Sequence, residues 1–190
     1  MEWSRRRAAT EAPRAHRARP LGWAVGAVVL AVILAAGGSA AAGTPPRAPL
    51  ATPTKKAKMV CAKEAQHDIA GVLAIKPAAV TKPTWTNQLY SCTYQYPTGS
   101  FTVSVKQLAD RAATTQYFNA LGTLLNRLPD DVPMGDGAYL TADGSMVVRK
   151  DNNVLDVDAG KLPAQFSKLH LSPADVASSV AMTILGCWKG

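Results

Sequence analysis

Few residues of this sequence could perform acid–base chemistry, and the best placed of them is a histidine. His67 lies three residues after Glu64 and next to Asp68, so a helix would put the carboxylate of Glu64 on the face of His67. Such a histidine could act as a general acid or base near neutral pH. The sequence contains no HExxH, GxSxG, Walker or paired-glycine dinucleotide motif. A solvated helix histidine is therefore the simpler interpretation, and a secreted hydrolase using His67 with Asp68 or Glu64 is the alternative.

The acid- and amide-rich stretch from Met134 to Gly160 could bind calcium through its side-chain oxygens. An EF-hand loop needs oxygen ligands at alternate positions, a glycine at the sixth position and a carboxylate at the twelfth. Counted from Asp151, the fifth position is Leu155 and the sixth is Asp156, so the pattern fails. We interpret the acids as turn residues and as the solvated face of a strand, and a weak surface cation at Asp156 and Asp158 is the alternative. The sequence predicts no metal site and no cofactor.

Three cysteines could form one disulfide bond and leave one thiol. Cys92 alternates with Tyr94 and Tyr96 along a predicted strand, and these residues face the helix that begins near Cys61. We therefore predict a bond between Cys61 and Cys92, with pairing of Cys61 and Cys187 as the competitor. The predicted bond closes a loop of about 32 residues and would stabilise the fold by about 3 to 4 kcal/mol. The absence of a CxxC pair argues against a redox or metal role.

Three aromatic residues could line a groove for a ligand or a glycan: Trp85, Tyr90 and Trp188. Aromatic side chains are also ordinary core residues, so burial at the edge of the core is the alternative. These residues form the only ligand site that the sequence predicts, and it contains no catalytic group.

We expect a single folded domain over residues 59–190, and its helices and strands must position all of these residues. Periodicity, caps and turn residues predict helices over 61–73, 110–128 and 172–188, and strands over 89–96, 101–108, 138–142, 145–150 and 153–159. The order of helix, two strands, helix, three strands and helix is typical of an α+β domain. We expect a mostly antiparallel sheet of about five strands covered by helices.

The apolar periodicity also predicts which side chains are buried. The expected helix stripes are Ala65, Ile69, Val72 and Leu73 in the first helix, Tyr117, Leu121, Leu124 and Leu128 in the second, and Val176, Val180, Ile184 and either Cys187 or Trp188 in the third. Strand alternation predicts that Thr102, Ser104 and Lys106 face water, as do Asp156 and Asp158.

The N-terminal part of the chain has the composition of an export signal. Six arginines in residues 1–20 precede an uncharged stretch from Leu21 to Ala42. Small residues at Ala40 and Ala42 suit a signal peptidase. Retention as a transmembrane helix is equally open, because 22 residues form a helix of about 33 Å and a hydrocarbon core is about 30 Å thick. In both cases the arginines stay in the cytoplasm and the residues after Gly43 are exported.

The positive charge of the chain belongs to its N-terminal part. The net charge is +8, yet from Met59 to Gly190 eight Lys and three Arg balance eleven Asp and Glu. A nucleic-acid-binding domain needs excess positive charge on its folded surface, so we predict no nucleic-acid partner. Residues 43–58 contain four prolines and indicate an extended linker. The linker lysines either remain solvated or lie on anionic lipid headgroups.

The sequence also resembles a family of actinobacterial exported proteins and lipoproteins of unknown function. The resemblance rests on Cys61, on the strand motif SCTY from Ser91 to Tyr94, and on the loop MGDGAYL from Met134 to Leu140. It covers about residues 59–188 and implies a small PsbP-like or LpqN-like α+β fold in the cell envelope, with no catalytic residue. One departure is that lipoproteins carry a cysteine directly after the apolar run, whereas Cys61 lies far beyond Ala42. This departure argues against lipidation.

These features together predict a non-catalytic, extracytoplasmic binding or accessory module of the cell envelope. The module would be secreted, or held at the membrane by its N-terminal helix if that helix is not cleaved. The sheet face or the loop around Trp85 is expected to meet the partner.

Overall fold

The computed structural model describes residues 51–188. The chain divides into one unit over Met1–Gly43 and a second over Thr44–Gly190, and every described residue belongs to the second. The predicted export segment and most of the predicted linker therefore lie outside the described residues. Within residues 51–188, each helix is too short or too polar to cross a membrane.

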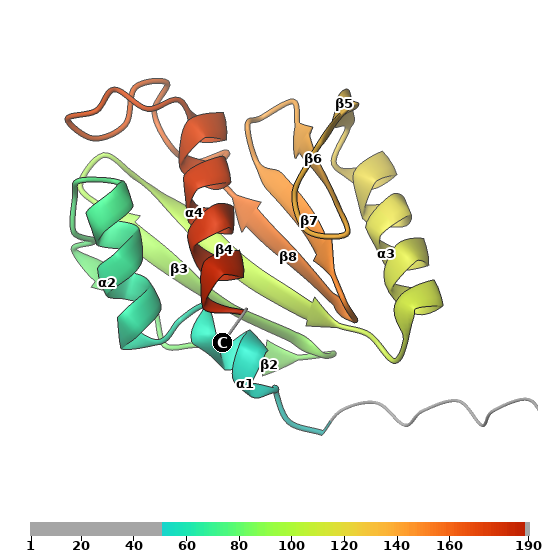
Figure 1. Ribbon diagram of the computed structural model, residues 1–190. Helices are drawn as coiled ribbons and strands as arrows, with labels where there is room; N and C mark the ends of the chain where they lie inside the picture. The colour runs from blue at the N-terminus through green and yellow to red at the C-terminus, as the bar shows by residue number, and fades with distance from the viewer. Residues whose placement is uncertain (1–50, 189–190) are drawn as a thin grey trace, which may run out of the picture. The chain divides into compact units, whose positions relative to one another are not determined.

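The described residues form an α+β fold with four helices and an eight-stranded antiparallel sheet (Figure 1). The helices are α1 (Lys55–Met59), α2 (Lys63–Val72), α3 (Arg111–Leu124) and α4 (Pro173–Cys187). The strands are β1 (Ala79–Val80), β2 (Thr84–Thr86), β3 (Leu89–Tyr96), β4 (Gly99–Gln107), β5 (Arg127–Val132), β6 (Gly137–Thr141), β7 (Met146–Lys150) and β8 (Asn153–Asp158). The predicted fold class is confirmed, but the sheet has eight strands where the sequence predicts about five.

The strands lie in the order β1-β3-β4-β8-β7-β6-β5, and β2 is a further partner of β3. Every pairing of these strands is antiparallel. β4 and β8 are neighbours although α3 and three strands lie between them in the sequence. Their register places Val103 opposite Val157 and Ser104 opposite Asp156. This register decides which side chains of the two strands share a face.

Strands β1, β2 and β5 are absent from the sequence-based prediction for two physical reasons. β1 and β2 have two and three residues, which are too few to show an alternation of apolar and polar side chains. β5 contains Pro129, and proline lacks the N–H group that a central strand must donate. The structure places β5 at the edge of the sheet, where proline is tolerated.

The second predicted helix ends four residues early. α3 stops at Leu124, and Asn126 has φ of 53°, a left-handed conformation that asparagine tolerates after a helix. The chain then enters β5, so Leu128 lies in a strand. Leu124 is 75% exposed, which contradicts its predicted burial. The helix instead buries Thr114, Phe118 and Gly122, with Tyr117 and Leu121 partly buried.

Helices α1, α2 and α4 lie against one face of the sheet and enclose the main core (Figure 1). As predicted, Cys92, Tyr94 and Tyr96 are buried on this face, and Tyr94 stacks on Phe101 with ring centres 4.9 Å apart. In α2, Ala65, Ile69 and Leu73 are buried, but Val72 is 46% exposed and does not belong to the stripe.

Helix α4 begins as its sequence predicts. Ser172 accepts a hydrogen bond from the amide of Asp175 at 3.2 Å, and the Asp175 carboxylate accepts one from the Ser172 amide at 3.1 Å. Pro173 occupies the start of the helix. Val176, Val180 and Ile184 are buried against the sheet.

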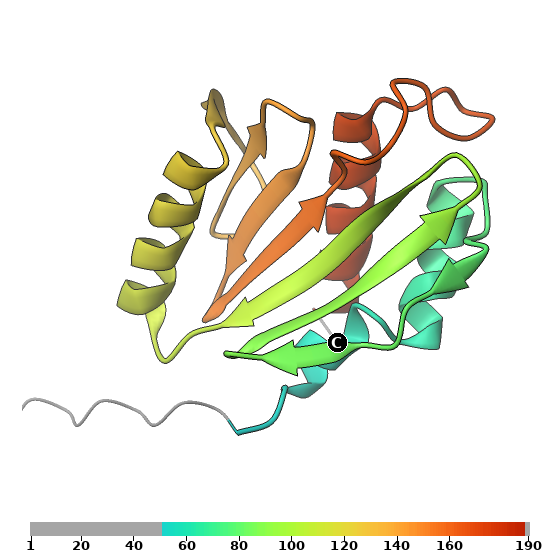
Figure 2. The same cartoon turned by 180° about the vertical axis from the view of Figure 1, so that it is seen from behind.

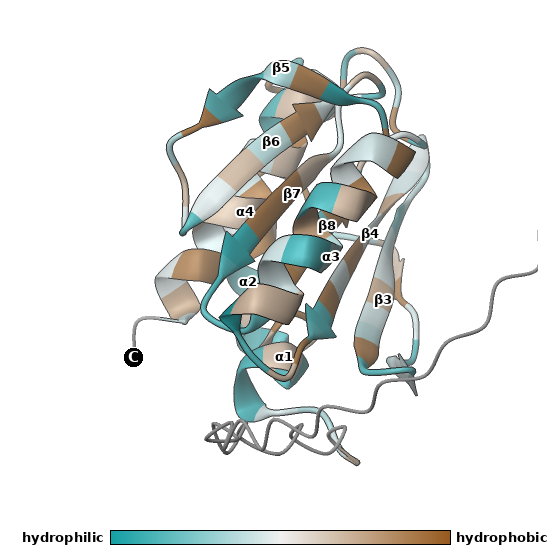
Figure 3. Cartoon of the chain, turned by 90° about the vertical axis from the view of Figure 1, so that its right-hand side faces the viewer, coloured by the Kyte–Doolittle hydropathy of each residue, from teal (hydrophilic) through white to brown (hydrophobic). Residues whose placement is uncertain are grey.

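Helix α3 covers only part of the opposite face. It lies over β7 and β8 and encloses a second, small cluster made by Phe118, Tyr139, Val147 and Val154 (Figure 3). Figure 2 shows this face toward the viewer, and none of the described helices covers the part of it that β2, β3 and β4 form. The edge of α3 against this open part of the sheet frames the site described next.

Candidate functional site

The open part of the sheet carries hydroxyl side chains. The alternate residues of β2, β3 and β4 that point to this face include Thr84, Ser91, Thr93, Thr102 and Ser104, which we call the hydroxyl face. Thr84 Oγ1 lies 3.0 Å from Ser91 Oγ, and Thr93 Oγ1 lies 2.9 Å from Thr102 Oγ1. Ser104 is buried, contrary to its predicted exposure, while the other four are partly or fully exposed. The hydroxyl face therefore offers neighbouring donors and acceptors on a rigid sheet.

Asp156 lies where the hydroxyl face meets α3. Alternation along β8 puts its side chain on this face, opposite Ser104. Its Oδ1 atom is buried and has no hydrogen-bond partner among residues 51–188. A buried carboxylate oxygen without a donor is energetically costly, and such groups are rare in folded proteins. The prediction that Asp156 belongs to a fully solvated strand face is therefore wrong.

A small hollow of about 60 Å³ adjoins Asp156 between α3 and β4. Its other lining residues are apolar at Leu89, Leu121 and Val154 and polar at Ser104, Lys106 and Tyr117. A water molecule in the liquid occupies about 30 Å³, so the hollow has room for a group of only a few heavy atoms. It can hold one small functional group of a larger partner, and it is too small for a whole drug-sized ligand.

Lys106 lines the hollow, but its ammonium group does not pair with Asp156. Lys106 Nζ donates a hydrogen bond to the carbonyl oxygen of Asn87 and lies 5.6 Å from the ring centre of Tyr117. Within residues 51–188, no ion pair involves Asp156. The hollow therefore combines an acceptor that lacks a donor with a cation that is held elsewhere.

The surroundings of Asp156 strongly favour its neutral form. Burial, followed by the negative charges of Asp158 and Asp143, raises the pKa of Asp156 to about 7. Burial and then Asp156 itself raise the pKa of Tyr117. A carboxyl group with such a pKa exchanges between its acid and carboxylate forms near neutral pH. Strongly perturbed groups beside a hollow are candidates for functional sites.

The other acids of the stretch from Met134 to Gly160 have structural partners, as the turn interpretation predicts. Asp143 accepts hydrogen bonds from Thr141 Oγ1 at 2.5 Å and from the Ser145 amide at 3.1 Å, and thereby holds the β6–β7 turn. Asp136 accepts one from the Asp151 amide at 2.8 Å. Within the described residues, no group of three acid, histidine or cysteine side chains is placed to hold a metal ion.

The predicted ligand site is divided by the structure. Trp85 and Tyr90 are cross-strand partners on β2 and β3 and are partly buried. Trp188 is only 5% exposed and belongs to the main core. Trp85 Nε1 donates to the carbonyl oxygen of Ala51 at 3.2 Å, and Trp188 Nε1 donates to that of Lys56 at 3.1 Å. Both indoles therefore hold the segment around α1 in place.

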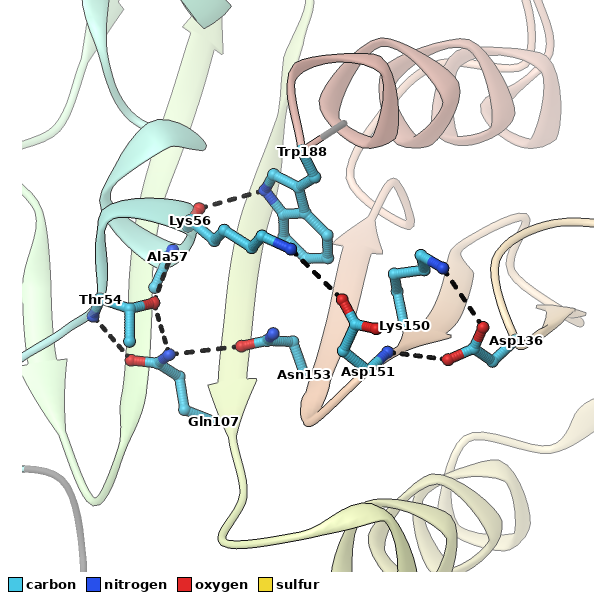
Figure 4. Close-up of polar contacts among 9 residues, drawn as sticks. All are labelled: Thr54, Lys56, Ala57, Gln107, Asp136, Lys150, Asp151, Asn153 and Trp188. Carbon is cyan, nitrogen blue, oxygen red and sulfur yellow. Dashed lines mark hydrogen bonds and ion pairs between the residues drawn. The ribbon is translucent and has the colours of Figure 1, made fainter. Parts of the chain in front are cut away.

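Polar contacts fasten the same segment to the sheet (Figure 4). The Thr54 amide donates to Gln107 Oε1 at 2.9 Å, and Gln107 Nε2 donates to Thr54 Oγ1 at 2.6 Å and to Asn153 Oδ1 at 3.3 Å. Lys56 Nζ lies 3.2 Å from Asp151 Oδ2. Residues 54–58, which the sequence assigns to an extended linker, are thus part of the fold. We call residues 51–59 the N-terminal strap.

The structure places the candidate acid–base residues of the sequence on the exposed surface of α2. His67, Glu64 and Asp68 are all exposed on α2, and among residues 51–188 no side-chain hydrogen bond joins His67 to another group. Asp68 Oδ2 lies 3.9 Å from the Cys187 sulfur instead. His67 is not among the residues that line the hollow beside Asp156.

The cysteines pair as predicted. A disulfide bond joins Cys61 to Cys92, and Cys187 is a free, partly buried thiol at the end of α4. Burial, followed by the neighbouring Asp68 carboxylate, raises the pKa of the Cys187 thiol. A raised pKa lowers the thiolate population and hence the reactivity of this thiol.

Sequence reasoning missed the hollow because its residues come from four separate elements. The available signal was the alternation of side chains along β8. It correctly places Asp156 on one face of the sheet and its neighbours Leu155 and Val157 on the other. Nothing local indicates that Tyr117 and Leu121 of α3 would lie over this carboxylate. The burial of Asp156 follows from the β4–β8 pairing and from the packing of α3.

Comparison of the chain with family models, with curated proteins and with solved structures finds no match. The resemblance to actinobacterial exported proteins therefore stays a prediction.

Proposed function

We propose that this protein is a non-catalytic, extracytoplasmic binding or accessory module of the cell envelope, and that its partner docks on the hydroxyl face. The observation that carries the proposal is the open β2–β3–β4 face, with the unpartnered Asp156 oxygen at its edge. Hydroxyl groups on a flat sheet can exchange hydrogen bonds with a polar partner, and a sheet does not reorganise on binding.

Two further observations support this assignment. The bond between Cys61 and Cys92 is consistent with an oxidising compartment outside the cytoplasm. The other face of the sheet is occupied by α1, α2 and α4, which leaves the hydroxyl face as the larger accessible surface of the sheet. A hydrolase using His67 has no comparable support, because His67 is exposed without a partner on α2.

Site-specific photocross-linking in living cells tests the proposal. A benzoylphenylalanine at Thr93 samples the hydroxyl face, and the same residue at His67 samples the opposite side of the sheet. We expect a discrete cross-linked product from the Thr93 position and none of that mass from the His67 control. Products of equal mass and yield from both positions, or no product from Thr93, would contradict docking on the hydroxyl face.

A further inference from the structure

The Oδ1 atom of Asp156 lacks a hydrogen-bond donor although Ser104, Lys106 and Tyr117 also line the hollow, and this defines the chemistry of what the hollow can bind. Oδ1 of Asp156 is buried without a partner, and the adjoining space of about 60 Å³ is unfilled by protein atoms. A suitable occupant must bring at least one N–H or O–H group to this oxygen. It must also be small at its tip, because the hollow has room for only a few heavy atoms.

The lining of the hollow further limits the occupant to an amphipathic group. Leu89, Leu121 and Val154 offer apolar contacts to a short hydrocarbon stem. The charges that face Asp156 from β8 and from the β6–β7 turn are the carboxylates of Asp158 and Asp143. The phenols of Tyr117 on α3 and Tyr139 on β6 also lie close to Asp156. This surrounding is negative, so a positively charged donor gains more than a neutral one.

Lys106 is the one cationic residue among the described residues that line the hollow, and its ammonium group is already engaged. Its ammonium group is bound to the Asn87 carbonyl and lies against the Tyr117 ring. In the β4–β8 register, Lys106 is the partner of Val154 and Ser104 is the partner of Asp156. Lys106 therefore lies on the same face as Asp156, two residues further along β4 than Ser104. It lines the hollow while its ammonium group is bound elsewhere.

We propose that this hollow is a binding site for one primary alkylammonium group, in which the carboxylate of Asp156 accepts the N–H donor and the apolar walls hold the stem. The inference rests on the proposed binding function and deepens it, because it states which group of the partner is recognised at the edge of the hydroxyl face. A lysine side chain of a protein and a free amine share this chemistry.

The pH dependence follows from the same groups. Only the ionised form of Asp156 attracts a cation, and an alkylammonium ion stays protonated well above neutral pH. The apparent affinity scales with the ionised fraction of Asp156, so the affinity should be about tenfold or more weaker at pH 5.5 than at pH 8. Asp158, Asp143, Tyr117, Tyr139 and Lys106 are the titratable groups that surround this equilibrium.

The test uses the full-length protein in zwitterionic detergent, labelled with nitrogen-15 and titrated with ethylammonium chloride while amide shifts are followed. Ethanol serves as the uncharged control of similar size. We expect saturable shifts at the amides of Ser104, Val154 and Asp156 with ethylammonium and none with ethanol. Asp156→Asn should weaken binding at least tenfold, because the isosteric amide carries no charge.

Lys106→Met separates binding of an external amine from two simpler possibilities, in which the hollow receives the Lys106 ammonium group itself or holds only water. If the hollow receives an external amine, removing the nearby positive charge should tighten ethylammonium binding by about two- to fivefold. Loss of binding in Lys106→Met, or identical titrations of wild type and Asp156→Asn, would overturn the proposal. A hollow that holds only water would show no saturable difference between ethylammonium and ethanol, which would also overturn it.

Two further probes assign the source of the amine. N-acetyl-lysine methylamide represents a lysine in a protein, and putrescine represents a free amine; the tighter binder identifies the class. The outcome is independent of the cross-linking experiment. A cross-linked partner that persists in Asp156→Asn, with no ethylammonium binding, would refute this inference alone, whereas ethylammonium binding without a cross-linked product would refute docking on the hydroxyl face alone.

Discussion

At the scale of single residues, Asp156 combines a cost to stability with a capacity for binding. Its Oδ1 atom is buried without a donor, and burial raises its pKa to about 7. The protein therefore holds a carboxyl group in an environment that resists its ionisation. Binding sites often contain such groups, because the same unfavourable environment strengthens the interaction with an incoming charge.

The pH dependence of stability should reveal this cost. In the unfolded chain, Asp156 has a pKa of about 3.9. Between this value and about 7 the folded state binds the proton more tightly, so the free energy of unfolding falls as pH rises through this window. From pH 5 to pH 8 we expect Asp156 to contribute a loss of about 2 to 3 kcal/mol, measured by urea unfolding.

Asp156→Asn should remove this contribution and make the variant more stable relative to the wild type at pH 8 than at pH 5. Asp158→Asn on the same strand face leaves the Asp156 carboxyl in place but removes one of the charges that raise its pKa, so its stability curve should fall with pH less steeply than that of the wild type and more steeply than that of Asp156→Asn. Parallel stability curves for Asp156→Asn and the wild type would show that Asp156 is not desolvated.

The disulfide bond gives a second prediction at the residue scale. Cys61 lies between the N-terminal strap and α2, and Cys92 is buried in β3, so the bond ties the start of α2 to the sheet. Replacing Cys61 or Cys92 with serine should lower the free energy of unfolding by about 2 to 5 kcal/mol. Cys187→Ala, which breaks no bond, should cost noticeably less.

Non-reducing peptide mapping of the exported protein should yield one cross-linked peptide pair that contains Cys61 and Cys92. Cys187 should be alkylated without prior reduction. A mapped bond from Cys187 to either of the other cysteines would contradict the structure.

At the scale of elements, the end of α3 depends on a single backbone conformation. Asn126 has φ of 53°, a left-handed conformation that strains every residue with a Cβ, and asparagine tolerates it better than alanine because its short polar side chain can hydrogen-bond locally. Asn126→Ala should lower the free energy of unfolding by about 1 to 2 kcal/mol, whereas Asn126→Gly should be nearly neutral. Asn119→Ala, at an exposed position inside α3, is the control and should not destabilise. Equal effects of Ala and Gly in thermal unfolding would contradict this account.

The N-terminal strap is the second element whose position rests on a few contacts. Gln107→Ala removes the partner of the Thr54 amide and of Asn153 Oδ1, and so leaves polar groups without their bonds. We expect a loss of about 1 to 3 kcal/mol and faster hydrogen exchange at the amides of Thr54 and Lys58. Gln95→Ala, at an exposed position of β3, is the control. Unchanged exchange at Thr54 would show that the strap is held mainly by its indole contacts.

At the scale of the whole molecule, the location of the domain remains a prediction from the N-terminal sequence. The positive-inside rule holds the arginines before Leu21 in the cytoplasm. An alkaline phosphatase fusion after Lys58 should therefore be active, and a fusion before Leu21 should be inactive. A mature N-terminus at Gly43, found by mass spectrometry of the cell-associated protein, would show that the apolar segment is cleaved and rule out a permanent anchor. An active fusion before Leu21 would contradict export in this orientation.

The sequence alone determined the features that depend on residues close together in the chain. The capping box of Ser172 and Asp175, the β6–β7 turn at Asp143 and Gly144, and the inward face of Cys92 all follow from short-range hydrogen bonding or from strand alternation. The α+β class follows from the order of such elements. These signals are reliable because the groups that produce them are neighbours in the unfolded chain as well.

Only the tertiary structure decided the features that depend on distant segments. Strand alternation places Asp156 on a polar face, but the packing of α3 over β8 buries its oxygen and creates the hollow with Lys106 and Tyr117. Likewise, residues 54–58 look like a linker until Gln107 and Trp188 bind them. Burial is a property of the neighbours that the fold brings together, and no local pattern of residue types records which neighbours these are.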